Sequence, residues 1–172
     1  LRVGIAGFGT IGKVIGKALD EGISGLTLVA VTSGSVEKAE KNMSNFAHPV
    51  PVVSADALIN NADIIVECAP TSAFMSVAQP CLQQGKILVT VSGAAILQNP
   101  EIVETAKIHN GKIVLATGAL LGLDAVRAAA QGRIYSVKMV TRKPPTSLIK
   151  AKYVIENDID LSNLREPLRL FK

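Results

Sequence analysis

Residues 3–12 read Val-Gly-Ile-Ala-Gly-Phe-Gly-Thr-Ile-Gly, an apolar run followed by the spacing GxGxxG. In such a turn the first glycine allows a tight passage from strand to helix, the second lets the backbone approach a diphosphate, and the third lets the helix pack against the strand. The amides that follow would face the anion at the positive end of the helix dipole. We therefore predict a dinucleotide cradle, with a glycine-rich turn that binds nothing as the alternative. The predicted cofactor-binding residues of this turn are Gly7, Phe8, Gly9, Thr10, Ile11 and Gly12.

Residues 1–118 alternate short β-branched runs with stretches of helical composition, which is typical of βαβ units and of a parallel sheet covered on both faces. The predicted strands are 1–6, 26–32, 50–53, 63–68, 86–91 and 112–117. The predicted helices between them are 10–21, 36–44, 55–60, 72–84 and 99–109. This inventory predicts the α/β fold class: a Rossmann doubly wound parallel sheet that forms a dinucleotide-binding domain over residues 1–118.

The character of the chain changes from residue 119 onward. Residues 120–130 have helical composition, residues 134–141 alternate with Tyr135, Val137 and Met139 on one face, and residues 168–172 begin a second alternation. Such alternation suits antiparallel strands with one covered face, but two or three strands cannot close a core alone. We expect residues 119–172 to be the beginning of an α+β domain that is incomplete in this chain.

The composition favours a compact globular protein, since 48% of the 172 residues are hydrophobic and 19% are charged. Aromatic residues make up only 3% and the net charge of +4 is spread out, so no nucleic-acid partner is expected. No apolar run reaches the roughly 18 residues of a membrane span. Cys68 and Cys81 lack the spacing of metal ligands. We expect two reduced cysteines, no metal site and a cytoplasmic protein that is not bound to a membrane.

The second predicted strand ends in Thr32-Ser33-Gly34-Ser35, where sites that prefer NAD usually carry an Asp or Glu for the ribose 2′-hydroxyl. No carboxylate there would repel a 2′-phosphate, and the hydroxyls of Thr32 and Ser33 could donate to one. The same hydroxyls could instead cap the helix that begins near Val36. The cofactor is therefore NADP or NAD, with both open.

Ligands of open parallel sheets bind beyond the carboxyl ends of the strands. Small residues at three of these ends would leave room for a nicotinamide ribose, although ordinary turn chemistry also explains them. The candidates for cofactor contact are Cys68, Ala69, Pro70 and Ser92, with residues 117–119 at the third end. Glu67 could face the site or carry a structural charge. Cys68 has no nearby base for a nucleophilic role, and we expect His48 and His109 on the surface.

Three stretches that follow the glycine turn, 65–69 (IVECA), 117–124 (TGALLGLD) and 141–148 (TRKPPTSL), resemble the L-aspartate dehydrogenase family over essentially the whole chain. The resemblance implies NAD(P)-dependent oxidation of the amino group of L-aspartate to iminoaspartate, which yields oxaloacetate and ammonia or enters nicotinamide-cofactor (NAD) biosynthesis. It also implies that Ala119 contacts the cofactor, that residues 119–172 begin a catalytic and dimerisation domain, and that the protein is a homodimer.

The sequence offers candidates for cofactor binding but no candidate for the catalytic base. The family's Asn-x-His motif, which carries its catalytic histidine, would fall beyond Lys172, so we assign no catalytic residue. Lys143 is a candidate for holding a substrate carboxylate or, alternatively, a solvated strand-end lysine. The loop Val91–Ala95 departs from the family's Ser-x-Gly-Ala-Leu arrangement. The alternatives are a homoserine dehydrogenase or dihydrodipicolinate reductase-like enzyme, and an NAD(P)-binding module without catalysis.

Overall fold

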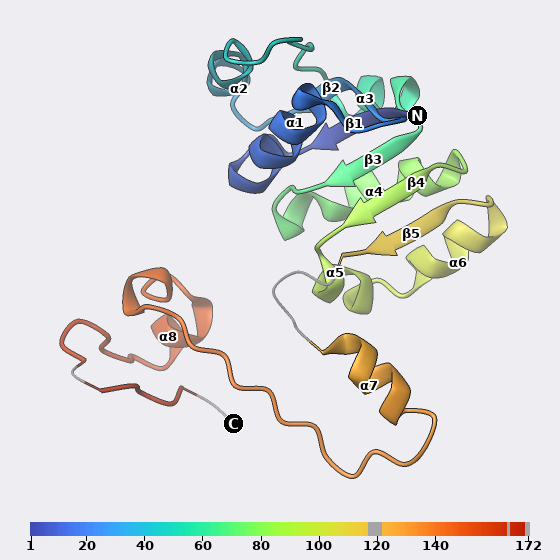
Figure 1. The fold of residues 1–172 in the computed structure, drawn as a ribbon. Helices are drawn as coiled ribbons and strands as arrows, with labels where there is room; N and C mark the ends of the chain where they lie inside the picture. Colours follow the sequence, from blue (N-terminus) through green and yellow to red (C-terminus); the bar gives the residue numbers. More distant parts are fainter. Residues whose placement is uncertain (117–121, 165, 171–172) are drawn as a thin grey trace. The chain divides into compact units, whose positions relative to one another are not determined.

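The computed structural model describes residues 1–116, 122–164 and 166–170 (Figure 1). The chain divides into two compact units, Leu1–Leu123 and Asp124–Lys172. Ala119 and the last residue of the predicted strand 112–117 lie outside the described residues.

The first unit is built on a parallel sheet with the strand order β2-β1-β3-β4-β5. The strands are β1 (Arg2–Ala6), β2 (Thr27–Thr32), β3 (Ile64–Glu67), β4 (Ile87–Thr90) and β5 (Lys112–Leu115). The helices between them are α1 (Thr10–Gly22), α2 (Val36–Met43), α3 (Ala55–Asn61), α4 (Phe74–Gln83), α5 (Gly93–Gln98) and α6 (Glu101–Ile108), with a 3₁₀ turn η1 (Thr71–Ala73) before α4. The predicted Rossmann doubly wound fold of the first part of the chain is confirmed (Figure 1).

One predicted strand, 50–53, is reduced to a single parallel bridge between Val31 and Val52. The Val31 amide donates to the Pro51 carbonyl over 3.1 Å, and the Val53 amide donates back to the Val31 carbonyl over 2.9 Å. Pro51 has no amide hydrogen, which limits how far this ladder can extend. The segment 50–53 lies beside β2, on the side away from β1. It therefore occupies the third-strand position of the Rossmann order 3-2-1-4-5-6.

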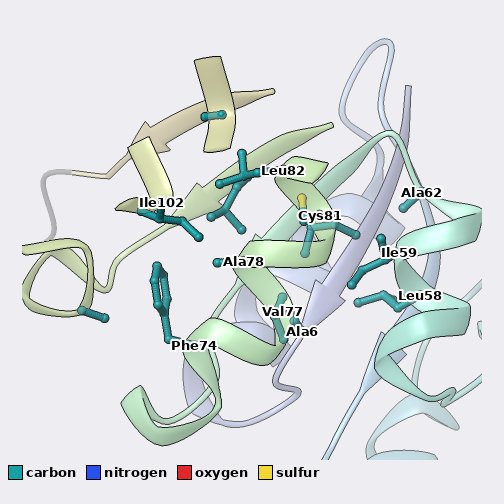
Figure 2. Packing of buried hydrophobic residues seen from close by; sticks show 14 of the residues in the cluster. Ala6, Leu58, Ile59, Ala62, Phe74, Val77, Ala78, Cys81, Leu82 and Ile102 are labelled. Atoms are coloured by element: carbon teal, nitrogen blue, oxygen red, sulfur yellow. The ribbon is translucent and has the colours of Figure 1, made fainter. Parts of the chain in front are cut away.

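Adjacent residues of the first strand pack on opposite faces of the sheet. Val3 and Ile5 belong to a cluster with Phe8 and residues of α1, β2 and α2, while Ala6 belongs to a second cluster with α3, α4 and α6. Figure 2 shows the second cluster, in which Phe74 of α4 lies near Ile102 of α6. Both faces of the sheet are therefore covered along β1, whereas Val114 and Leu115 of the edge strand β5 are 47% and 51% exposed.

The second unit contains all of α7 (Leu123–Ala129) except its first residue, a 3₁₀ turn η2 (Pro145–Ser147) and α8 (Lys152–Glu156). The antiparallel strands predicted at 134–141 and 168–172 are not confirmed, because residues 134–141 and 168–170 form no strand. A strand needs a hydrogen-bonded partner and a cover for its apolar face. In the described part of this unit Tyr135, Val137 and Met139 have neither and are 85%, 70% and 68% exposed. The alternation is present, but no described segment pairs with residues 134–141.

Within the described residues, no helix has the length and apolarity that crossing a membrane requires. The same residues contain no group of three or more His, Cys, Asp or Glu side chains placed to hold a metal ion.

Candidate functional site

The three glycines of the turn after β1 differ in what an added Cβ would contact. Gly7 has a φ of +98°, and a Cβ there would lie 2.7 Å from the backbone of Cys68 and Ala69. A Cβ on Gly12 would lie 2.1 Å from the Gly7 carbonyl oxygen. The protein's own packing therefore requires both glycines. A Cβ on Gly9 would meet no atom within 4 Å, so this position faces open space.

The backbone amides of the turn fall into two groups. Those of Gly7 and Phe8 donate to the Thr32 carbonyl over 3.2 and 2.9 Å, and the Phe8 side chain is buried. Within the described chain, the amides of residues 9–12 at the start of α1 have no hydrogen-bond acceptor, and the first turn of α1 carries no acidic residue. Free amides at a helix N-terminus bind anions. The anion would thus be held by residues 9–12, since the Phe8 amide is already used by the protein.

The end of β2 offers hydroxyl groups and no carboxylate. The Thr32 hydroxyl oxygen accepts from the Gly7 amide over 3.2 Å, and the Ser33 hydroxyl oxygen accepts from the Ser35 amide over 3.2 Å. Ser35 is the N-cap of α2, but its side chain makes no capping hydrogen bond. The first carboxylate after β2 is Glu37, in the first turn of α2. Thr32 and Ser33 therefore hold turns together and keep their hydroxyl protons available to an acceptor.

The ends of β3 and β4 are joined by a hydrogen-bonded network around Glu67, which is fully buried. Its Oε1 accepts from the Ala69 amide over 2.9 Å, and its Oε2 accepts from the Thr90 hydroxyl over 2.5 Å. The Thr90 oxygen in turn accepts from the Ser92 amide over 2.9 Å. The network connects two of the predicted cofactor contacts, Ala69 and Ser92. Sequence reasoning missed Thr90, whose only signal was a polar residue at the end of an apolar strand.

Cys68 lies between the glycine turn and this network. Its amide donates to the Ala6 carbonyl over 2.8 Å, and its side chain is partly buried. Burial first, and then the nearby charge of Glu67, raise the pKa of the Cys68 thiol to about 11. Such a thiol is almost entirely protonated at neutral pH and is a poor nucleophile. Pro70, another predicted cofactor contact, is exposed.

The remaining titratable candidates lie away from this edge or in the second unit. His48 is 3.4 Å from Asp20 beside a cavity of about 310 Å³ at the end of α1 and the start of β2, the amino edge of the sheet. His109 follows α6, directly before β5 begins. Neither histidine is placed at the carboxyl edge. Lys143 is exposed in the second unit.

Two family models cover most of the chain. Residues 7–116 match the model described as homoserine dehydrogenase, NAD binding domain, and residues 124–172 match the model described as aspartate dehydrogenase, C-terminal. Among solved structures, the chain is similar to a homoserine dehydrogenase from Thiobacillus denitrificans, with a TM-score of 0.58 and 17% identity over 67% of this chain and 29% of that one. It is also similar to the WlbA dehydrogenase from Bordetella pertussis, with a TM-score of 0.60 and 22% identity over 78% of this chain and 44% of that one. Because the first model matches more than half of the chain, residues 7–116 are an NAD-binding domain of the dehydrogenase class.

Among curated proteins, the chain is similar to one kind of dehydrogenase in particular. The chain is 46% identical to an L-aspartate dehydrogenase from Bradyrhizobium diazoefficiens, over 100% of this chain and 61% of that protein. It is 41% identical to L-aspartate dehydrogenase 3 from Bordetella bronchiseptica, over 99% of this chain and 63% of that protein. This chain belongs to the family of NAD-binding domains whose model matches residues 7–116, and over its whole length it is similar to L-aspartate dehydrogenases. It spans somewhat less than two thirds of the length of these relatives.

Proposed function

We propose that this chain is the cofactor-binding part of an NAD(P)-dependent oxidoreductase that acts on the amino group of L-aspartate. The observation that carries the proposal is the turn at residues 9–12, where the Cβ direction of Gly9 is open and the amides at the start of α1 have no acceptor in the described chain. A diphosphate fits such a turn in charge and in hydrogen bonding. The similarity of residues 124–172 to aspartate dehydrogenases supports the substrate.

In this proposal the chain's own residues bind and orient. The amides of residues 9–12 hold the diphosphate, and the loops after β3 and β4, with Cys68, Ala69, Pro70 and Ser92, line the nicotinamide end. Ala119 is retained as a cofactor contact. The chemistry supplied by a bound nicotinamide is acceptance of a hydride from the amino-bearing carbon.

The substrate side is proposed to involve the second unit. Lys143 is its candidate for a substrate carboxylate, because an exposed ammonium can pair with an anion. The base that takes the ammonium proton is proposed to be the histidine that the family resemblance implies beyond Lys172. His48 and His109 lie toward the amino edge of the sheet and are not proposed for this role.

The site is proposed to accept NADP as well as NAD. Its support is the end of β2, where residues 32–35 carry hydroxyls and no carboxylate to repel a 2′-phosphate.

The division of labour is also proposed: residues 1–118 bind the dinucleotide, and residues 119–172 begin the catalytic and dimerisation domain of a cytoplasmic homodimer. The exposed apolar side chains of Tyr135, Val137 and Met139 support an interface in this region. The free Cys68 and Cys81 support a reducing compartment. Light scattering of the protein at its natural length tests the dimer, since a monomer mass at micromolar concentration contradicts it.

The function is tested by titrating the natural-length protein with NADH and NADPH, and then measuring reduction of NAD or NADP on addition of L-aspartate. Turnover with L-aspartate, and with neither homoserine nor other amino acids, supports the proposal. Turnover with homoserine alone favours the other activity, to which the name of the model matching residues 7–116 points. Binding of a dinucleotide without turnover of any amino acid favours a non-catalytic module.

A further inference from the structure

Glu67 is a buried acidic residue for which the proposed reaction has no direct use. It stands opposite Thr90 in the parallel pairing of β3 and β4, and the two residues are 0% and 1% exposed. No ion pair within the described chain involves Glu67. Burying a carboxylate without a cation is unfavourable, and an apolar side chain of similar volume would avoid that penalty. General stability of the sheet therefore does not explain this residue.

The hydrogen bonds of Glu67 go to the loops that leave the two strands. One carboxylate oxygen receives the Ala69 amide and the other receives the Thr90 hydroxyl, which itself receives the Ser92 amide. A single side chain thus fixes the backbone after β3 directly and the backbone after β4 through Thr90.

The loop after β3 also touches the glycine turn. Cys68 and Ala69 lie so close to Gly7 that a Cβ there would be 2.7 Å from their backbone atoms. The amides that would hold the diphosphate and the amides fixed by Glu67 are therefore parts of one continuous edge.

The strand order decides which half of a dinucleotide this edge would meet. The end of β2, on one side of β1, is the place for the adenosine ribose in this fold. β3 and β4 lie on the other side of β1. With the diphosphate at the turn, the loops tied to Glu67 flank the nicotinamide half.

We propose that Glu67 is a positioning residue: its carboxylate holds the loops after β3 and β4 in the shape that receives the nicotinamide half of the cofactor. The proposal rests on the proposed function, because it requires a dinucleotide at the glycine turn.

The test compares two ligands in the natural-length protein by calorimetric titration: NADH, and ADP-ribose, which lacks the nicotinamide. If the wild-type protein prefers NADPH, then NADPH and 2′-phospho-ADP-ribose replace them. Glu67→Gln keeps the volume, but its single oxygen cannot accept from both the Ala69 amide and the Thr90 hydroxyl, and its NH2 group can replace a contact only if the Thr90 hydroxyl turns its own hydrogen away. We expect the Kd of NADH to rise about tenfold and that of ADP-ribose to change less than about threefold.

A second variant changes the hydroxyl that donates to Glu67. Thr90→Val removes the hydroxyl without changing the shape, and we expect the same split between the two ligands. Thr90→Ser returns the hydroxyl, and we expect it to recover most of the NADH affinity that Thr90→Val loses. The matched control is Ile65→Val in the same buried strand, which should lower the melting temperature and leave the ratio of the two Kd values unchanged.

The outcomes separate the two proposals. Equal changes for both ligands, or none, in Glu67→Gln and Thr90→Val would overturn the role of Glu67 while leaving the proposed function standing. A wild-type protein that binds neither ligand would overturn the proposed function and this inference with it. Should Glu67→Gln not fold, the pair Thr90→Val and Thr90→Ser decides.

Discussion

Replacing Gly9 by valine separates what the fold needs at the glycine turn from what a ligand needs. Gly9 has a negative φ of −86° in an extended conformation, and no atom beyond its two chain neighbours lies within 4 Å of its Cβ position. It caps α1 without a side-chain hydrogen bond, so the substitution removes none. We expect the free energy of unfolding of Gly9→Val to stay within about 1 kcal/mol of wild type.

Cofactor affinity should respond very differently to Gly9→Val. The valine methyl groups would occupy the approach to the amides of residues 9–12, which have no acceptor in the described chain. A hydrogen bond to a charged group contributes about 1.5–3 kcal/mol, so loss of two of them raises the Kd about 100-fold or more. Calorimetric titration with NADH or NADPH measures this loss, and urea unfolding followed by circular dichroism measures stability.

The control for Gly9→Val is Gly132→Val in the second unit, where the added Cβ makes only an ordinary contact of 3.8 Å with the Ala129 carbonyl oxygen. This variant should bind the dinucleotide as wild type does. Wild-type affinity in Gly9→Val would refute the diphosphate site. A stability loss of about 3 kcal/mol would instead refute the reasoning that the Gly9 position is sterically open.

Three other substitutions test neighbouring features. Gly12→Ala should lower the free energy of unfolding by about 3 kcal/mol, because its Cβ would lie 2.1 Å from the Gly7 carbonyl oxygen; an unchanged urea midpoint contradicts this. Ser33→Asp should weaken NADPH relative to NADH about tenfold, since a carboxylate would face the 2′-phosphate; an unchanged ratio of Kd values argues against that placement. Hydrogen bonds from the side chain and amide of Arg2 lower the pKa of Asp63 to about 2, below its value in the unfolded chain. The stability it contributes is therefore present above about pH 4 and lost as the pH falls toward 2, and acid unfolding curves should show a smaller loss for Asp63→Asn.

The five paired strands and most helices of the first unit could be predicted because their signals are local. A β-branched run followed by an apolar helical stretch fixes the period of burial wherever it occurs, as in Arg2–Ala6 and α1. The segment 50–53 was predicted as a full strand but forms a single bridge, because β propensity does not take into account that Pro51 has no amide hydrogen to donate. The short α5 was missed, since six residues offer too little periodicity to distinguish a helix from a turn.

The site was predictable only in part, for a related reason. The glycine spacing is a signal within six consecutive residues, so it predicts the turn from the sequence. The proposed role of Glu67 depends on Thr90, which lies 23 positions further along the chain and contacts Glu67 only because β3 pairs with β4. The alternation at 134–141 shows the opposite case. There the pattern is clear, but a strand also needs a partner, and a pattern does not contain its partner.

Buried or unusual residues elsewhere in the first unit show why Gly9 and Glu67 stand out. The buried carboxylate of Asp20 accepts from two amides and from Lys17, which accounts for it as an anchor of the loop at residues 47–48. Lys86 donates to the carbonyls of Ile59 and Ala62, which closes the end of α3. These polar groups are explained by the element they complete. Among the described residues, the Cβ direction of Gly9 is open and Glu67 has no cationic partner. Both residues lie at the carboxyl edge of the sheet, where the proposed dinucleotide would account for them.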